Sequence, residues 1–96
     1  MPSAAILGSP VLPHDGWSGG VLVVGSPTVL INGVPACRMG DVGTPHFKPA
    51  NPPHPNLVAV GSSTVLVNGI PLARMGDLMT CGSMIAAGSP NVIAGG

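Results

Sequence analysis

A duplicated segment is the feature that most constrains the fold of this chain. Residues 25–41 read GSPTVLINGVPACRMGD and residues 61–77 read GSSTVLVNGIPLARMGD, at an offset of 36, and twelve of the seventeen positions are identical. The apolar exchanges, such as Ile31 with Val67, nearly preserve side-chain volume. Repeats of this length indicate one small structural unit per copy, with a core completed by the neighbouring copies. We therefore expect a domain built from repeated units.

Each copy is predicted to form short strands joined by tight turns. A β-branched run, Thr-Val-Leu followed by Ile or Val, leads into Asn32-Gly33 in the first copy and Asn68-Gly69 in the second. Asn-Gly is the strongest short-range hairpin signal, because both central residues of a type I′ turn need a positive φ. No window shows a helical period with caps. The predicted fold class is all-β, with short hairpins and little helix.

A third copy is present but divided between the two ends of the chain. Residues 88–96, GSPNVIAGG, align with residues 25–33, and the segment from Pro2 to Ala5 continues this alignment if the termini are joined. One extra residue is then needed before Gly8, which corresponds to the glycines at 40 and 76. We expect one closed, pseudo-threefold domain over residues 1–96 with its termini side by side and no residues left for a further domain. Its repeats would span about 1–24 joined with 88–96, 25–60 and 61–87.

Composition excludes several classes of protein. The chain has three basic and three acidic residues, too few cations for nucleic-acid binding. Its apolar runs, such as residues 21–24, are too short to cross a bilayer. The N-terminus lacks the basic and apolar regions of a signal peptide, so we expect synthesis in the cytoplasm. A disulfide between Cys37 and Cys81 is not expected there.

Small size makes an additional source of stability necessary. Gly and Pro account for 27 of 96 residues, and the chain has one Trp, one Phe and no Tyr, so its core must be aliphatic and modest. Domains of this size commonly depend on a metal, disulfides or a partner surface.

Histidines and one cysteine recur at similar places in the repeats. His14 and His46 each lie six residues after the repeated glycine (residues 8 and 40), and Cys81 lies five residues after its counterpart at residue 76. His54 follows His46 by eight residues in the same Pro-rich connection and can supply a fourth ligand. Three imidazoles and one thiolate suit tetrahedral structural zinc. The alternative is that these are ordinary loop residues, since no local CxxC or HExxH motif is present.

Other polar residues have simpler interpretations. Cys37 lies opposite Ala73 in the repeat, which favours a small buried residue. Arg38 and Arg74 each precede an aspartate by three residues, which favours loop ion pairs over a catalytic role. No catalytic residue is predicted, because the sequence contains no glutamate, no phosphate loop opening a helix and no identifiable triad.

The repeated boxes Pro35-Ala36-Cys37-Arg38 and Pro71-Leu72-Ala73-Arg74 resemble the Pro-Ala-Ala-Arg motif of the PAAR-repeat proteins. The segment Pro2-Ser3-Ala4-Ala5 resembles a degraded third box, with Ala5 where an arginine would stand. The resemblance extends over essentially the whole chain, through the Asn-Gly hairpins, the Arg-Met-Gly-Asp continuation and the histidine placement.

This resemblance implies a conical β-protein that caps the trimeric VgrG spike of a bacterial type VI secretion system. Its base would sit on the end of the VgrG β-helix, and its point would contact and puncture the target membrane. The resemblance further implies effector or adaptor loading, delivery into the target cell, and a structural zinc near the point. The zinc ligands would be His14, His46, His54 and Cys81.

Three other functions fit the sequence less closely. One is a small zinc hydrolase, which requires that Cys81 does not coordinate and that water occupies an open position. Another is a self-associating β-module. The third is the tip of a phage-like contractile tail, which differs from the secretion-system tip only in its partner.

Overall fold

The computed structural model describes residues 2–12, 20–48, 51–80 and 82–95, with backbone only for residues 45–48 and 51–55. None of these residues is helical, so the described part of the chain contains no helix able to cross a membrane. The strands pair into four antiparallel hairpins, which confirms the all-β prediction. The strands of the described residues are β1 (Pro10–Val11), β2 (Gly20–Val21), β3 (Leu30–Ile31), β4 (Val34–Pro35), β5 (Val42–Lys48), β6 (Asn51–Leu57), β7 (Leu66–Val67) and β8 (Ile70–Pro71), and each pairs with the next in the order β1–β2, β3–β4, β5–β6 and β7–β8.

The two Asn-Gly turns have the backbone conformation that the sequence predicts. The φ angles of Asn32 and Gly33, between β3 and β4, are 52° and 79°. Those of Asn68 and Gly69, between β7 and β8, are 53° and 78°. Positive φ at both central residues is the requirement of a type I′ turn, and asparagine tolerates this region better than most residues.

A closed cycle of backbone hydrogen bonds relates the three repeats. The amide of Ala5 donates to the carbonyl of Ala73 at 2.9 Å, Ala73 donates to Cys37 at 3.0 Å, and Cys37 donates to Ala5 at 3.1 Å. All three side chains are fully buried. Because each residue donates to one neighbour and accepts from the other, three equivalent strands surround a common axis. The structure is therefore pseudo-threefold.

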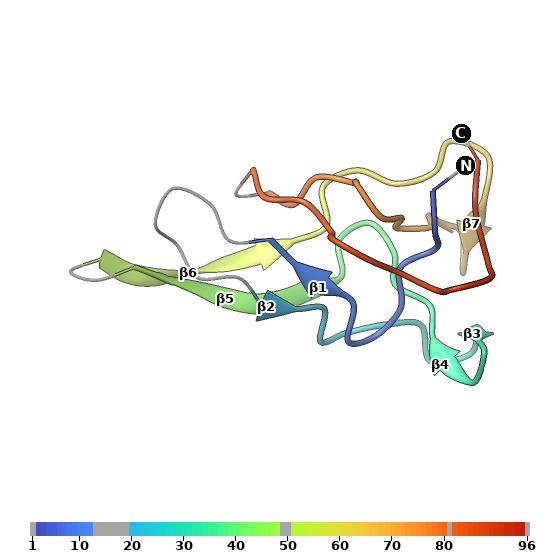
Figure 1. The fold of residues 1–96 in the computed structure, drawn as a ribbon, viewed down its shortest axis with the longest axis horizontal. Coiled ribbons are helices and arrows are strands. Elements are labelled where there is room, and N and C mark those ends of the chain that lie inside the picture. The colour runs from blue at the N-terminus through green and yellow to red at the C-terminus, as the bar shows by residue number, and fades with distance from the viewer. Residues whose placement is uncertain (1, 13–19, 49–50, 81, 96) are drawn as a thin grey trace.

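The third repeat is closed by the two ends of the chain, which lie side by side (Figure 1). The amide of Ala94 donates to the carbonyl of Pro2 at 2.9 Å. Ser3 pairs with Ile93 as Pro35 pairs with Leu30 in the first repeat. The two ends of the described chain therefore pair with each other as neighbouring strands of one hairpin do in the first repeat.

The alignment of the N-terminal box was wrong by one residue. The cyclic hydrogen bonds make Ala5 the counterpart of Cys37, so Ile6 and not Ala5 occupies the position of Arg38. The bridge between Ile6 and Ala36 corresponds to the bridge between Arg38 and Leu72. The extra residue therefore falls where the two termini meet, because from Ala5 onward the spacing to Gly8 equals that from Cys37 to Gly40.

The core has two layers of small and aliphatic side chains stacked along the pseudo-threefold axis. One layer joins the central cycle to a ring of Leu22, Val58 and Ile85, whose carbonyls accept from the repeated glycines. The other layer contains Ala4, Ile31, Ala36, Val67, Leu72 and Ala94. Aromatic rings are not needed, because three equivalent aliphatic residues at each level meet at the axis.

The molecule is elongated, with principal extents of 39 × 24 × 22 Å. One end holds β3–β4, β7–β8 and the paired termini, and we call it the base (Figure 1). The β5–β6 hairpin projects toward the opposite end, which we call the apex (Figure 1). The sequence had suggested only a Pro-rich connection in place of β5–β6. Proline is tolerated there because both strands of a two-stranded sheet are edge strands.

Candidate metal centre and exposed base

Three equivalent hairpins form a closed ring on the apical side of the core. They pair Pro10 with Val21, Val42 with Leu57, and Leu78 with Met84. Adjacent hairpins are joined by the bridges Leu22–Gly43, Val58–Met79 and Ile85–Val11. The ring holds the starts of the three segments that contain the predicted metal ligands.

The structure describes the backbone of only two of the four predicted ligands, His46 and His54. His14 and Cys81 lie outside the described residues, and the described residues contain no cluster of three or more His, Cys, Asp or Glu that could hold a metal. The residues Leu12, Thr44 and Thr80 begin the ligand-bearing segments, and each lies four residues after the repeated glycine. The three segments therefore begin at equivalent positions on the ring.

His46 and His54 occupy directly opposed backbone positions in the β5–β6 hairpin. Their α-carbons are register partners, although the register shifts on either side of this pair. Opposed α-carbons in an antiparallel ladder are about 4.5–5.5 Å apart. A separation of eight residues in the sequence gave no indication of this pairing.

Two threonine hydroxyls bond to the backbone where the ligand-bearing segments begin. Thr44 Oγ1 accepts from the amide of Val21 at 3.2 Å and donates to its carbonyl at 3.0 Å. Thr80 Oγ1 accepts from the amide of Leu57 at 3.1 Å. The sequence reasoning missed both residues, although their common distance from the repeated glycine was a usable signal.

Cys37 belongs to the central cycle and not to the apex. Its side chain is fully buried, and its thiol donates to the carbonyl of Val24 at 3.2 Å. The pKa of this thiol is raised from 9.0 to about 12, mainly by burial and additionally by the Asp41 carboxylate, while the Arg38 guanidinium opposes the rise. Its interpretation as a small buried residue is confirmed.

The raised pKa of Cys37 predicts a loss of stability at alkaline pH. Above pH 9.0 the unfolded chain releases the thiol proton while the folded chain retains it up to about pH 12. The free energy of unfolding should therefore fall as pH rises through this window, by at most about 1.4 kcal/mol per pH unit. Urea titrations of wild type and Cys37→Ala at pH 8 and pH 10 measure the effect. An equal loss in both proteins would contradict the assignment to Cys37.

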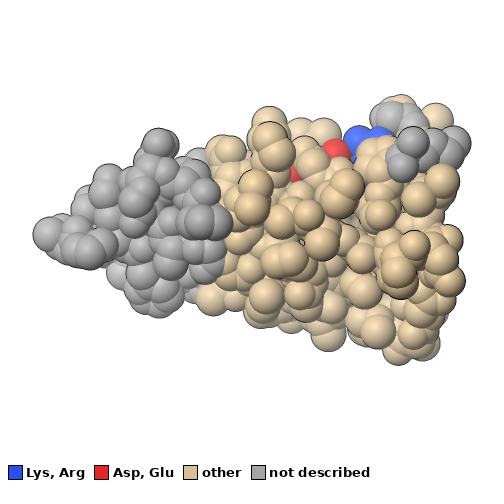
Figure 2. All heavy atoms as spheres, in the orientation of Figure 1, with Lys and Arg blue, Asp and Glu red and all other residues tan. Residues whose placement is uncertain are grey.

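Arg38 and Arg74 form the same ion pair in two repeats. Arg38 Nη2 lies 2.9 Å from Asp41 Oδ1, and Arg74 Nη2 lies 2.9 Å from Asp77 Oδ1. Each carboxylate also accepts from the arginine Nε and backbone amide. These bonds raise the pKa of both guanidinium groups. The predicted ion pairs are confirmed. On the face drawn in Figure 2, blue and red atoms lie near one another and the rest of the described surface carries no charged side chain.

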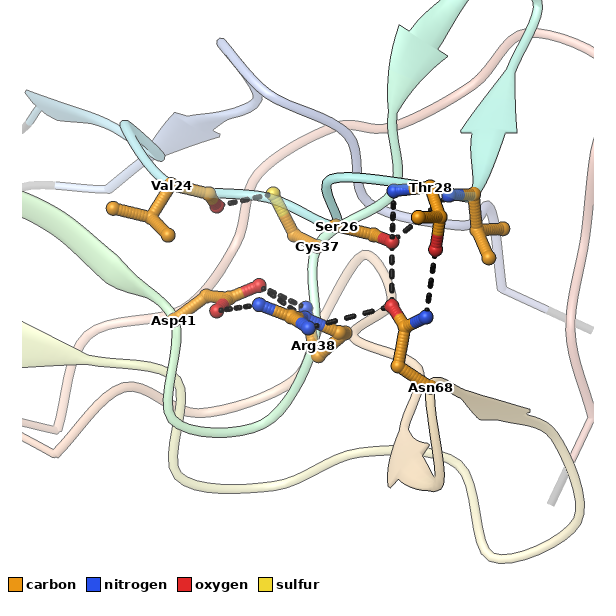
Figure 3. A network of polar contacts seen from close by, with 8 residues as sticks. Val24, Ser26, Thr28, Cys37, Arg38, Asp41 and Asn68 are labelled. Atoms are coloured by element: carbon orange, nitrogen blue, oxygen red, sulfur yellow. Dashed lines mark hydrogen bonds and ion pairs between the residues drawn. The ribbon is translucent and has the colours of Figure 1, made fainter.

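A polar network fixes the base hairpins to the neighbouring repeats (Figure 3). Ser26 Oγ donates to Asn68 Oδ1 at 2.5 Å, and Asn68 Nδ2 donates to Thr28 Oγ1 at 2.8 Å. Arg38 Nη1 also donates to Asn68 Oδ1, at 3.4 Å. At the corresponding positions, Ser62 Oγ donates to the carbonyl of Gly95 at 2.6 Å, and Ser89 Oγ accepts from Asn32 Nδ2 at 3.1 Å. Each repeat thus holds the base turn of the next, so the geometry of the base is set by all three.

Three large apolar side chains at equivalent positions remain exposed at the base. The exposed fractions of Leu30, Leu66 and Ile93 are 58%, 60% and 56%, the highest of the large hydrophobic residues in the described ranges. Their cross-strand partners Pro35, Pro71 and Ser3 identify them as one position in three repeats. The base therefore presents a pseudo-threefold apolar ring, which we call the base ring.

Comparison with protein families agrees with this architecture. A family model described as the PAAR motif matches residues 12–87, a span that contains both uninterrupted repeats. A search of curated proteins finds no match.

Proposed function

Because the chain belongs to the PAAR-motif family, we propose that it is a non-enzymatic spike-tip protein that sits by its base on a trimeric VgrG-type partner. The observation that carries the proposal is the base ring of Leu30, Leu66 and Ile93. A single chain with three equivalent apolar contacts can meet three identical subunits at once, which one chain without internal symmetry cannot do.

The exposure of the base ring favours a protein partner. Contiguous exposed apolar side chains commonly mark interaction surfaces, and these three lie on a base that carries short hairpins. Two-stranded hairpins present strand edges, which a β-helical partner can extend through backbone hydrogen bonds. The base would thus combine apolar contacts with strand addition.

At the apex we propose a structural zinc held by His14, His46, His54 and Cys81. The opposed positions of His46 and His54 and the equivalent starts of the three ligand-bearing segments are compatible with this donor set. Zinc would supply a tetrahedral cross-link between the three ligand-bearing segments. Four protein ligands leave no open position for water, so the metal would have a structural and not a catalytic role.

The remaining parts of the proposal follow from the role of a spike tip. The apex would contact the target membrane transiently during puncture, and effectors or an adaptor would travel with the tip. The protein would be cytoplasmic before the apparatus fires and then be delivered with the spike. A contractile phage-like tail would use the same base geometry.

Co-elution with a purified VgrG-type trimer in size-exclusion chromatography tests the docking proposal. We expect a complex at micromolar concentration, and separate elution of the two proteins would contradict it. Long assemblies of the chain by itself would instead favour the self-associating β-module. Turnover of an ester or peptide that disappears on chelation would favour the zinc hydrolase.

A further inference from the structure

In each repeat, one edge of the base strand pair is covered by a neighbouring repeat. The carbonyl of Pro35, on the outer edge of β4, accepts from the amide of Leu7 at 2.9 Å. The same bond runs from Met39 to Pro71 at 2.9 Å and from Met75 to Ser3 at 2.7 Å. One strand of every base pair is therefore already bonded on both sides inside the molecule.

The other edge carries the backbone groups of the base ring. Leu30 is the register partner of Pro35, which has no amide hydrogen, and beside this pair the amide of Ala36 donates to the carbonyl of Val29 at 3.0 Å. Bonded and non-bonded pairs alternate along an antiparallel ladder, so the amide and carbonyl of Leu30 point away from β4. Leu66 and Ile93 are oriented in the same way by the bonds from Leu72 to Val65 at 3.0 Å, from Ala4 to Val92 at 2.9 Å and from Ala94 to Pro2 at 2.9 Å. The described residues supply no hydrogen-bond partner for the amide or carbonyl of the three base ring residues.

A serine hydroxyl limits each open edge to one residue. Backbone groups that point to the same edge are two residues apart, and two residues before Leu30 the amide of Thr28 donates to Ser26 Oγ at 3.1 Å. The corresponding amides of Thr64 and Asn91 donate to Ser62 Oγ at 3.2 Å and to Ser89 Oγ at 3.4 Å. Two residues after Leu30 the chain enters its Asn-Gly turn. Each repeat thus offers one amide and one carbonyl to a partner.

The open edges face out of the base. β3 lies farther toward the base end than β4 (Figure 1). Behind the edges, Val29 and Val92 pack against the core but are only partly buried, and the equivalent Val65 is 36% exposed. An amide and a carbonyl beside apolar side chains match an extended strand, whose backbone offers the reciprocal acceptor and donor.

We propose that docking forms one β-bridge per repeat, in which the amide and carbonyl of Leu30, Leu66 and Ile93 pair with one strand from each subunit of the trimeric partner. The inference rests on the proposed docking function and assigns the backbone atoms that carry it. Three bridges on one chain form in a single binding event, so their contributions combine. An edge that is open at one residue also limits pairing between free chains.

Amide hydrogen exchange of the isotope-labelled full chain, with and without an excess of purified VgrG-type trimer, tests the assignment residue by residue. We expect the amides of residues 30, 66 and 93 to exchange at least about 100-fold more slowly in the complex than in the free chain. The amide of Leu78, in the ring of hairpins on the apical side of the core, is the control and should exchange equally fast in both.

A pair of variants separates the main-chain bond from the apolar contact. Leu30→Ala shortens the side chain and keeps the amide, whereas Leu30→Pro removes the amide at an edge position that tolerates proline. Leu30→Pro should bind the trimer about tenfold more weakly than Leu30→Ala, because a carbonyl of the partner is left without its donor. Thermal melting of both variants checks that they fold.

The outcomes distinguish this inference from docking itself. Unchanged exchange at the three amides in a complex that forms, or equal affinities of the two folded Leu30 variants, would overturn the inference and leave docking standing. Protection of the three amides in the chain alone, with the mass of a dimer, would assign the edges to a second copy and overturn it as well. Failure of the wild-type chain to bind the trimer would overturn both proposals.

Discussion

The substitution Cys81→Ser is expected to remove most of the bound zinc and to lower the melting temperature by more than about 10 °C. The proposed site would cross-link the three segments that begin at Leu12, Thr44 and Thr80, so loss of one ligand should weaken all three connections. Structural zinc contributes about 10 kcal/mol or more of apparent binding free energy, which is comparable with the stability of a whole small domain. Elemental analysis and differential scanning calorimetry measure the two effects.

Cys37→Ala is the matched control for the loss of a thiol. Cys37 lies in the central cycle, where both equivalent residues are alanines, so this variant should retain wild-type zinc content. Its melting temperature should change little at neutral pH, because alanine already occupies the two equivalent buried positions, Ala5 and Ala73. If Cys81→Ser retained full zinc and an unchanged melting temperature, Cys81 would be excluded as a ligand.

Aspartate substitutions in the base ring are expected to abolish docking without unfolding the chain. Leu30, Leu66 and Ile93 are all more than half exposed, so their replacement removes little from the core. In a docked complex each would be desolvated, and burying a carboxylate there would cost about 2 kcal/mol or more, as at interface hot spots. Each single substitution should weaken binding by about 30-fold, and the triple variant by more than 1000-fold.

Leu78→Asp provides the control for an exposed apolar residue away from the base. Leu78 is 43% exposed and pairs with Met84 in the ring of three hairpins on the apical side of the core. Because this ring lies away from the base, the substitution should leave the affinity for the trimer nearly unchanged. Biolayer interferometry against immobilised trimer measures all variants. Wild-type affinity in the triple base variant would show that docking does not use this surface.

Local signals explain why most of the fold could be predicted from sequence. The Asn-Gly turns need positive φ at both residues, and the structure has it at residues 32, 33, 68 and 69. The division of the third repeat followed from aligning GSPNVIAGG with residues 25–33. The one-residue error in the N-terminal box arose because Pro2 imitates the repeated proline. The hydrogen bonds of Ala5 and the bridge between Ser3 and Ile93 show the actual register.

The β5–β6 hairpin and the hydrogen bonds of the Thr44 and Thr80 hydroxyls became visible only in the structure. Prolines interrupt the alternating pattern of residues 42–57, so their sequence resembles a loop. The β5–β6 ladder nevertheless begins with the pairs Val42–Leu57 and Gly43–Asn56, within the ring of three hairpins on the apical side of the core. Thr44 and Thr80 share their distance from the repeated glycine, but threonine is also common in strands for reasons of propensity, so this shared spacing was easily overlooked. The spacing of the histidines and Cys81 identified candidate metal ligands. That His46 and His54 lie opposite each other depends on the register of β5 and β6, which the spacing does not give.

The stoichiometry of the docked complex tests the central claim most directly. If one chain presents three equivalent contacts to three subunits, native mass spectrometry of the reconstituted complex should show one copy of this chain per VgrG-type trimer at every excess of the chain. A complex that saturates at three copies per trimer would mean that each subunit binds its own chain. That result would contradict the proposed role of the pseudo-threefold base.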